Sequence, residues 1–164
     1  MKIIEKKILT QSDNTRIILL RVLAAHIARV VAPGQFVMLM VNQQGERIPL
    51  TLVDADNESI TLVFQEAGFT TRLLATLEVG DSLFSLVGPL GHKSELKKFG
   101  KVLLVAGGVG IAEIYPVSKA LKKLGNTVTV IVGARNKSLL FFLDELKLAC
   151  DQLVVATDVG SFGE

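Results

Sequence analysis

The sequence predicts two domains in series, an antiparallel β-barrel followed by a parallel α/β domain. Up to about residue 95, short runs rich in apolar and β-branched residues alternate with turn signals, which is typical of small antiparallel barrels. After about residue 97, strand and helix patterns alternate as βαβαβ, which predicts a parallel sheet with right-handed crossovers. We therefore expect domains at residues 1–96 and 97–164, the second one incomplete at its C-terminus.

The barrel is predicted from short strands that are separated by glycine, proline and polar turns. Pro33-Gly34 interrupts the chain early, and Gly88-Pro89-Leu90-Gly91 follows the last strand. A helical pattern is present only at residues 70–77. The expected strands are residues 3–9, 16–23, 35–41, 47–53, 59–65 and 81–87.

The second domain opens with residues 101–125, in which an apolar strand, a glycine turn and a helix follow one another. Residues 102–106 are all apolar, which predicts a parallel strand that is covered on both faces. Pro116 is expected in the first turn of the helix, where a missing N–H costs little. Gly125 is expected to end the helix as its C′ residue. The later elements are predicted at residues 127–132 (strand), 138–148 (helix) and 152–157 (strand).

The turn after this strand contains three glycines. A strand, a glycine turn and a helix can direct free backbone N–H groups at a phosphate, as in Rossmann-like domains. Gly108 and Gly110 match the first two positions of G-x-G-x-x-G, but Glu113 stands in place of the third glycine. The turn therefore indicates either nucleotide binding, which we favour slightly, or an ordinary tight βα connection.

Composition excludes several classes of function. The chain has 18 basic and 16 acidic residues, so its balance shows no nucleic-acid or membrane footprint. Cys150 is the only cysteine, which excludes an internal disulfide and an all-cysteine metal site within the chain. His26 and His92 have no metal-like partners at close spacing, so no metal ligand is predicted. No signal-peptide core precedes the first strand, and we expect a cytoplasmic protein.

Several motifs in a fixed order resemble the ferredoxin–NADP reductase superfamily. Arg47-Ile48-Pro49-Leu50-Thr51 is similar to the superfamily's flavin-binding arginine with a nearby Ser or Thr, and Gly88-Pro89-Leu90-Gly91 to the segment that joins its two domains. The remaining matches are Gly107-Gly108-Val109-Gly110-Ile111-Ala112 with Tyr115-Pro116, Gly133-Ala134-Arg135-Asn136-Lys137, and Thr157-Asp158. The resemblance extends from the first strand to the last residue.

Within the superfamily, the motifs are most similar to the small flavoprotein subunit of NADH-dependent ferredoxin:NADP oxidoreductase, also described as a sulfide dehydrogenase subunit. The resemblance implies FAD held between the two domains, hydride transfer from NAD(H) or NADP(H) to FAD, and single-electron transfer to an iron–sulfur or flavin partner. That partner is expected to be a larger oxidoreductase subunit or a ferredoxin. The alternatives are the electron-transfer subunit of dihydroorotate dehydrogenase B and a flavin-binding assembly module without turnover of its own.

The resemblance also assigns roles in the first domain. Arg47 is expected to pair with the FAD pyrophosphate, an interpretation that we favour over a solvated arginine at the start of a strand because of the surrounding motif. Pro49, Leu50 and Thr51 are expected against the flavin, with the Thr51 hydroxyl, our catalytic candidate, near its N5/O4 edge. From the residue alone, Thr51 is as well explained as a β-branched strand residue.

A second flavin segment is expected at the start of the helix at residues 70–77. Relatives have Gly-Lys-Thr-Thr against the pyrophosphate, and here Phe69 replaces the lysine. Gly68, Thr70 and Thr71 can still offer N–H and hydroxyl donors. A helix start with Thr70 or Thr71 as N-cap is a compatible structural explanation.

The cofactor residues that remain lie mostly in the second domain. Asp158 could accept a hydrogen bond from a cofactor hydroxyl, and Arg135 could meet an adenosine phosphate or be a plain loop residue. Relatives have a second acidic residue where this chain has Val159, so the sequence does not decide whether the nucleotide is NADH or NADPH. The expected set is Gly88, Gly107, Gly108, Gly110, Arg135 and Asp158.

Relatives continue with further strands, a segment under the nicotinamide and a cysteine-rich [2Fe–2S] site, for which one cysteine does not suffice. We expect the last strand, residues 152–157, to leave an edge and Val154 and Val155 partly uncovered. The 164 residues alone are therefore expected to self-associate or aggregate, and NADH is expected to reduce their flavin poorly.

Overall fold

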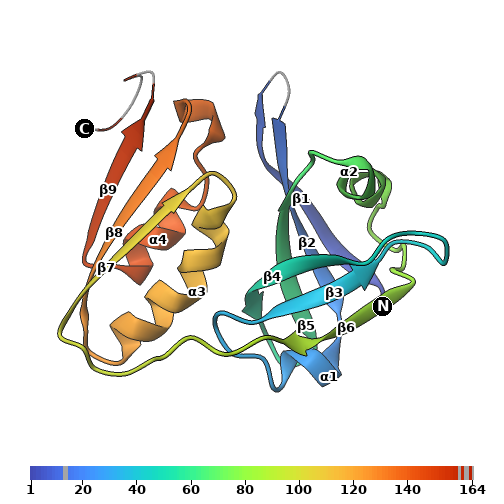
Figure 1. The fold of residues 1–164 in the computed structure, drawn as a ribbon, viewed down its shortest axis with the longest axis horizontal. Coiled ribbons are helices and arrows are strands. Elements are labelled where there is room, and N and C mark those ends of the chain that lie inside the picture. Colours follow the sequence, from blue (N-terminus) through green and yellow to red (C-terminus); the bar gives the residue numbers. More distant parts are fainter. Residues whose placement is uncertain (13–14, 159, 161–162, 164) are drawn as a thin grey trace. The chain divides into compact units, whose positions relative to one another are not determined.

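The structure of the protein is a computed structural model, which describes residues 1–12, 15–158, 160 and 163. Its contacts divide the chain into two compact units, Met1–Lys93 and Ser94–Glu164. The predicted fold class is confirmed, because an antiparallel six-stranded sheet is followed by a parallel three-stranded sheet with helices (Figure 1). The described residues include no helix with the length and apolar character that a membrane crossing requires.

The strands of the first unit form a sheet in the order β1-β2-β5-β4-β3-β6. The two end strands approach each other through an antiparallel bridge between Lys2 and Ser82, and the Ile3 N–H donates to the Asp81 carbonyl at 2.8 Å. These contacts bend the sheet into the predicted barrel. The strands are β1 (Ile3–Ser12), β2 (Thr15–Leu23), β3 (Phe36–Met40), β4 (Ile48–Ala55), β5 (Ser59–Gln65) and β6 (Ser85–Leu90).

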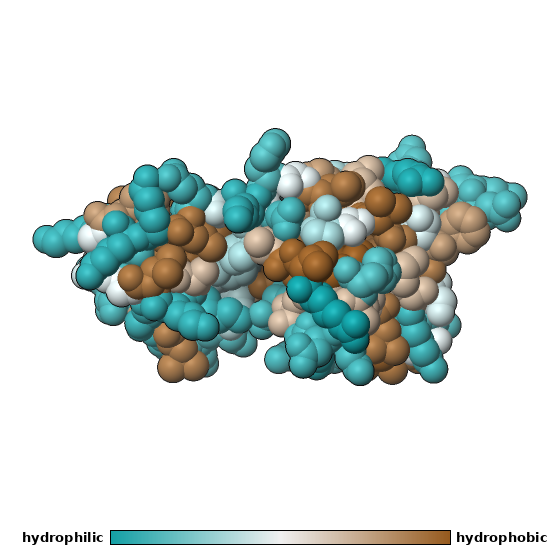
Figure 2. All heavy atoms as spheres, turned by 90° about the horizontal axis from the view of Figure 1, so that it is seen from below, coloured by the Kyte–Doolittle hydropathy of each residue, from teal (hydrophilic) through white to brown (hydrophobic). Residues whose placement is uncertain are grey.

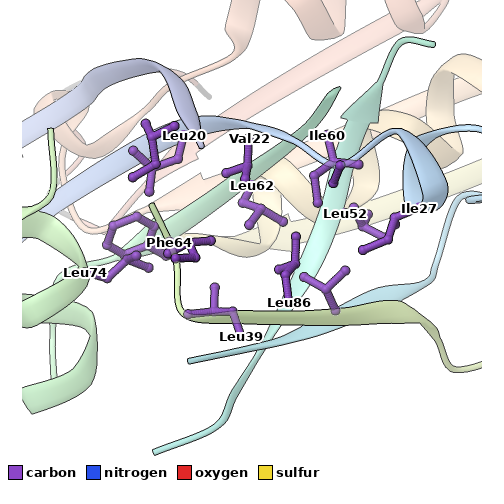
Figure 3. Close-up of a cluster of buried hydrophobic side chains, with 14 of the residues drawn as sticks. Leu20, Val22, Ile27, Leu39, Leu52, Ile60, Leu62, Phe64, Leu74 and Leu86 are labelled. Carbon is purple, nitrogen blue, oxygen red and sulfur yellow. The ribbon is translucent and has the colours of Figure 1, made fainter. Parts of the chain in front are cut away.

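The core of the first unit lies inside this curved sheet (Figure 3). Leu62 on β5 and Leu20 on β2, which are paired in register, share the inner face of the sheet and are both fully buried. Two helices complete the unit: α1 (Ala25–Ala28), which the sequence analysis did not predict, and α2 (Phe69–Thr76). Ile27 of α1 and Leu74 of α2 reach into the same core.

The second unit has the parallel strand order β7-β8-β9. Its central strand alternates sharply, because Val128, Val130 and Val132 are completely buried while the residues between them are not. This buried face lies against the helices. The elements are β7 (Lys101–Gly107), α3 (Gly110–Lys123), β8 (Thr127–Ala134), the 3₁₀ helix η1 (Lys137–Leu139), α4 (Leu143–Ala149) and β9 (Gln152–Thr157).

The prediction that β7 is covered on both faces is wrong. Leu103 and Val105 are 59% and 65% exposed, although the strand is apolar throughout. The chain adds β8 and β9 in the same direction, and right-handed crossovers then place both helices on one face of the sheet. Val154 and Val155 of β9 are half-buried, so the most exposed apolar side chains of this sheet are on β7.

The structure confirms the predicted C-terminal end of α3 but not the predicted position of Pro116. Gly125 is the predicted C′ residue, with φ of 78°, and its N–H donates to the Lys122 carbonyl at 2.9 Å. Pro116 is not in the first turn as predicted. It lies inside α3, where its missing N–H removes one backbone hydrogen bond of the helix. The proline is buried, so its ring packs in the core.

The helix predicted at residues 138–148 is also interrupted. The structure has η1 and α4 there, and Phe142 between them has φ of 58°. This left-handed conformation is unusual for a non-glycine residue. Phe142 packs against Phe141 and Tyr115, with ring centroids 5.3 and 5.5 Å away, so aromatic packing accompanies the break.

Candidate functional site

Strand β4 carries the first group of predicted cofactor residues and separates them onto two faces. Pro49 pairs with Met38, and Thr51 with Phe36, so these residues share the outer face of the β3–β4 ladder. Pro49 is exposed and Thr51 half-buried. Leu50 faces the other way and packs against the buried core, so its side chain is not on the face that carries Pro49 and Thr51.

Strand β6 extends the same outer face. Val87 is 44% exposed and pairs with Met38, so Met38 lies between Val87 and Pro49 in an apolar strip that crosses the three strands. Gly88 has a packing role that explains it without a ligand. A Cβ at Gly88 would come within 2.7 Å of Cγ1 of Val37, because β6 and β3 approach closely there.

The structure brings the segment before β4 to the start of α2. The Thr70 hydroxyl donates to Oε2 of Glu46 at 3.3 Å, and Thr70 is only 7% exposed. Arg47 follows Glu46 directly, so the loop that carries the predicted arginine lies at the first turn of this helix. This contact joins residues that are 24 positions apart in the sequence.

The predicted threonine donors are used within the protein. The Thr71 hydroxyl accepts the N–H groups of Ala67 and Gly68, both at 3.0 Å, and donates to the Gly68 carbonyl at 3.1 Å. Since Thr70 donates to Glu46, neither hydroxyl proton is left for a ligand. The N-cap of α2 is Gly68, not Thr70 or Thr71. The donors that the helix start can offer are therefore its first backbone N–H groups, which have no intrahelical acceptor.

Charges of both signs lie at this helix start, because the Glu46 carboxylate accepts from Thr70 there and Arg47 follows it directly. Arg47 is exposed and has no ion pair among the residues that the structure describes. The carboxylate of Glu66 lies two residues before Gly68, but it is paired with Arg16, and the hydrogen bond from Arg16 lowers the pKa of Glu66. A Cβ on Gly68 would meet nothing within 4 Å, so the backbone there is open to a ligand.

These donors suit a pyrophosphate. A guanidinium and backbone N–H groups at a helix start both bind phosphate oxygens, and an open glycine lets the ligand approach. Phe69 is 82% exposed beside Gly68, so its side chain adds an aromatic surface rather than a charge at the helix start. The residues present therefore fit the pyrophosphate of a dinucleotide.

The glycine turn of the second unit forms a tight βα connection. Gly108 has φ of 55°, and its N–H donates to the Gly133 carbonyl at 3.1 Å, so this N–H is not available to a phosphate. The N–H groups of Ile111 and Ala112 are likewise bonded within the turn. A Cβ on Gly108 would meet nothing within 4 Å, so the outside of the turn is open. Gly110 is the first residue of α3.

The remaining predicted residues of the second unit lie at the carboxyl ends of the parallel strands. Gly107 pairs with Gly133 at the ends of β7 and β8, and the Asp158 N–H donates to the Ala134 carbonyl at 3.2 Å. Arg135 and Asp158 are both exposed. Open α/β sheets bind ligands at the carboxyl ends of their strands, which is where these residues lie.

Two features of the site could not be found from sequence patterns. Glu46 holds Thr70 in place, but no local signal links residues so far apart. Met38 lies on the exposed strip, but β3 is apolar at every position, so its sequence does not show which residues face outward.

No model of a known protein family matches the sequence. The dihydroorotate dehydrogenase B (NAD⁺) electron transfer subunit homolog of Thermotoga maritima is 46% identical over 139 residues, which are 84% of this chain and 49% of that protein. The corresponding subunit of Geobacillus thermodenitrificans is 32% identical, over 84% of this chain and 56% of its own length. The chain thus spans about half the length of these curated relatives.

Two solved structures have folds similar to that of this chain. The structure of an NADH-dependent reduced ferredoxin-NADP oxidoreductase, described for flavin-based electron bifurcation, is 36% identical, with a TM-score of 0.89 over 99% of this chain and 58% of that one. Ferredoxin-NADP⁺ reductase from Plasmodium falciparum, 15% identical, has the same fold, with a TM-score of 0.77 over 95% of this chain and 68% of that one.

The chain therefore has the fold of the ferredoxin–NADP reductase superfamily, as its motifs predicted. More particularly, it is a homologue of the electron-transfer subunits of dihydroorotate dehydrogenase B.

Proposed function

We propose that this chain is the FAD- and nicotinamide-binding part of a flavoprotein electron-transfer subunit, of the kind that serves dihydroorotate dehydrogenase B. One observation of the geometry supports this most strongly. The Glu46–Thr70 hydrogen bond brings the loop of Arg47, a cation without an ion pair among the described residues, to the first turn of α2. The curated relatives, named as such subunits, support the choice of partner, which is a larger catalytic subunit.

In this proposal, residues of the first unit hold and orient the cofactor. Arg47 and the first N–H groups of α2 bind the FAD pyrophosphate, with Gly68 giving access. The exposed faces of Pro49 and Thr51 lie against the flavin, and Thr51 positions its hydroxyl toward the flavin edge. Leu50 contributes through its backbone, because its side chain is in the core. Bound FAD would supply the two-electron and one-electron chemistry.

Residues of the second unit are proposed to bind the nicotinamide nucleotide. The turn at Gly107, Gly108 and Gly110, which is open on its outside, would bind the phosphates of the nucleotide at the carboxyl ends of the strands. Arg135 would contact an adenosine phosphate, and Asp158 would accept a hydrogen bond from a ribose hydroxyl. Gly88 is required for the close packing of β6 against β3, and it would contact the cofactor through its backbone.

A second candidate function is the small subunit of an NADH-dependent ferredoxin–NADP oxidoreductase. The observation in its favour is the solved structure that matches 99% of this chain at 36% identity. The two candidates share the flavin site and differ in the protein that receives the electrons, which is a flavin-bearing catalytic subunit in one and an iron–sulfur partner in the other.

Flavin binding by an Arg47→Ala variant tests the proposed site. A hydrogen bond to a charged group contributes about 1.5–3 kcal/mol, so we expect FAD affinity to fall about 10- to 100-fold. Arg29→Ala is the matched control, since Arg29 is also exposed and follows α1, away from β4 and α2 in the sequence. Isothermal titration with FAD measures both variants. Equal affinity of Arg47→Ala and the parent protein would remove Arg47 from the site.

Anaerobic mixing of the FAD-loaded protein with NADH or NADPH tests turnover. Bleaching of the flavin absorbance supports an oxidoreductase, whereas flavin that is bound but stays oxidised supports an assembly module. Addition of oxidised ferredoxin or of a dihydroorotate dehydrogenase catalytic subunit to reduced protein then separates the two candidate functions by the rate of flavin reoxidation.

A further inference from the structure

The exposed face of α2 carries the only charged residue of this helix, Arg72. Phe69 and Arg72 are three positions apart, so they lie on the same face, and both are exposed. Thr70 and Leu74 are buried on the other side of the helix. Other large apolar side chains also reach the surface of the molecule (Figure 2), so the exposure of Phe69 carries no argument by itself. The position of the arginine charge does.

Helix geometry directs the side chain of Arg72 toward the first turn of α2. In an α-helix the Cα–Cβ bond tilts toward the N-terminus, and a long side chain lies over the turn that precedes it. The turn that precedes Arg72 begins at Gly68, whose carbonyl accepts the Arg72 N–H at 3.0 Å. Glu66 lies just before this turn. The hydrogen bond from Arg16 is the largest influence that lowers the pKa of Glu66, and the charge of Arg72 lowers it further.

The charge of Arg72 is not compensated within the helix. α2 has no acidic residue in its first turn, and Arg72 forms no ion pair with the residues that the structure describes. A positive charge near the start of a helix is unfavourable, because the helix dipole is positive at that end. A bound anion at the first turn would remove this penalty.

We propose that Arg72 is a second cation for the FAD pyrophosphate, on the opposite side of the α2 axis from Arg47. This inference rests on the proposed function, because it assigns a further residue to the same site. Thr70, which accepts the loop before β4 through its contact with Glu46, is two positions before Arg72. Two positions are about 200° apart around a helix, so Arg47 and Arg72 approach the first turn from opposite sides.

A second cation also balances the charges at this helix start. The pyrophosphate of FAD carries two negative charges, and the carboxylate of Glu46 adds a third beside Thr70. The helix dipole is equivalent to about half a positive charge, so Arg47 and the dipole together leave an excess of negative charge. With Arg72 the positive and negative charges are nearly equal.

FAD binding by an Arg72→Ala variant is the direct test. An exposed ion pair changes affinity by up to about fivefold, so isothermal titration is expected to show a loss of about fivefold in dilute buffer. Salt screens exposed charges, so the difference from the parent protein is expected to disappear at about 1 M salt. A loss that is equally large in concentrated salt would overturn the proposal, because the residue would then act through packing.

A double variant that moves the cation tests whether the charge itself acts. Phe69→Lys with Arg72→Ala places the positive charge three positions earlier on the same face, beside Gly68. This variant is expected to bind FAD within about twofold of the parent protein. If it binds as weakly as Arg72→Ala alone, the assignment of Arg72 to the pyrophosphate is wrong.

Two comparisons complete the test. Arg29→Ala, at an exposed arginine after α1, is the matched control and is expected to leave FAD affinity unchanged. Far-UV circular dichroism verifies that each variant is folded, which we expect because alanine is a good helix former. If Arg47→Ala weakens FAD binding and Arg72→Ala does not, the proposed flavin site stands and Arg72 is not part of it. A parent protein that binds no FAD would overturn the proposed function, and this inference with it.

Discussion

Asn126 connects the segment before β7 to the end of α3. It is 5% exposed, and its side chain makes four hydrogen bonds to backbone groups. Its Oδ1 accepts the N–H groups of Phe99 and Gly100 at 2.6 and 3.0 Å. Its Nδ2 donates to the carbonyls of Lys97 and Leu121 at 3.0 and 2.8 Å. Every polar atom of this amide is therefore satisfied inside the second unit.

The Asn126→Ala variant removes all four bonds at once. A hydrogen bond contributes about 0.5–1.5 kcal/mol net, which gives at most about 6 kcal/mol for the set of four. The loss is smaller because Phe99 and Gly100 are exposed, so water can reach their N–H groups, and because the Leu121 carbonyl still accepts the Asn126 N–H at 3.3 Å. We expect the second unit to lose about 2–3 kcal/mol of unfolding free energy.

The assay uses the single tyrosine of the chain. The sequence has one tyrosine and no tryptophan, and Tyr115 lies in α3, so tyrosine fluorescence during urea unfolding reports on the second unit. Asn126→Asp keeps the acceptor but turns a second oxygen toward the Lys97 and Leu121 carbonyls, so acceptor faces acceptor at a buried position, and this variant should be at least as destabilising as Asn126→Ala. Asn57→Ala, at an exposed residue of the first unit, is the control. A loss below about 0.5 kcal/mol for Asn126→Ala would refute the reasoning, since surface substitutions have effects of that size.

Two further predictions concern the glycine turn and acid stability. Gly108→Val is expected to destabilise the second unit by about 1–2 kcal/mol, because Gly108 is left-handed, whereas Gly110→Ala, whose Cβ would make an ordinary 3.9 Å contact, should be neutral in the same fluorescence assay. The pKa of Asp56 is held well below its usual range, chiefly by hydrogen bonds from the Glu58 and Ser59 N–H groups. A depressed folded-state pKa stabilises above the unfolded value of about 3.9, so the stability difference between the parent and Asp56→Asn should be full at neutral pH and shrink as pH falls below about 4, as circular dichroism of urea unfolding would show. A difference that grows in acid would contradict this assignment.

The local elements of the fold were predictable because their signals are local. Residues 59–65 and 152–157 are strands with the predicted bounds, since apolar runs between turn residues specify a strand without reference to the rest of the chain. Gly125 ends α3 as predicted, because a left-handed C′ position selects glycine by sterics alone. The order of motifs along the chain was likewise sufficient to indicate the superfamily.

The predictions that failed depended on what lies next to a residue. Residues 138–148 have a continuous helical pattern, but Phe142 adopts a left-handed conformation and packs against Tyr115, which comes from a different helix. Pro116 is tolerated inside α3, where its ring is buried. Neither outcome has a signal in the neighbouring sequence, because both depend on packing between elements.

The same distinction applies to the candidate site, where the sequence determined some features and the tertiary structure others. The sequence by itself determined which residue types are present: an arginine before a strand, glycines after another strand, and threonines at a helix start. Tertiary structure decided which of them are available, because hydrogen bonds between distant residues use up donors and acceptors. The Thr70 hydroxyl donates a hydrogen bond to Glu46, and the Gly108 N–H donates to the Gly133 carbonyl, whereas Arg47 has no ion pair among the described residues. The exposure of β7 was decided there too, since an apolar strand is buried only if the chain topology brings something to cover it.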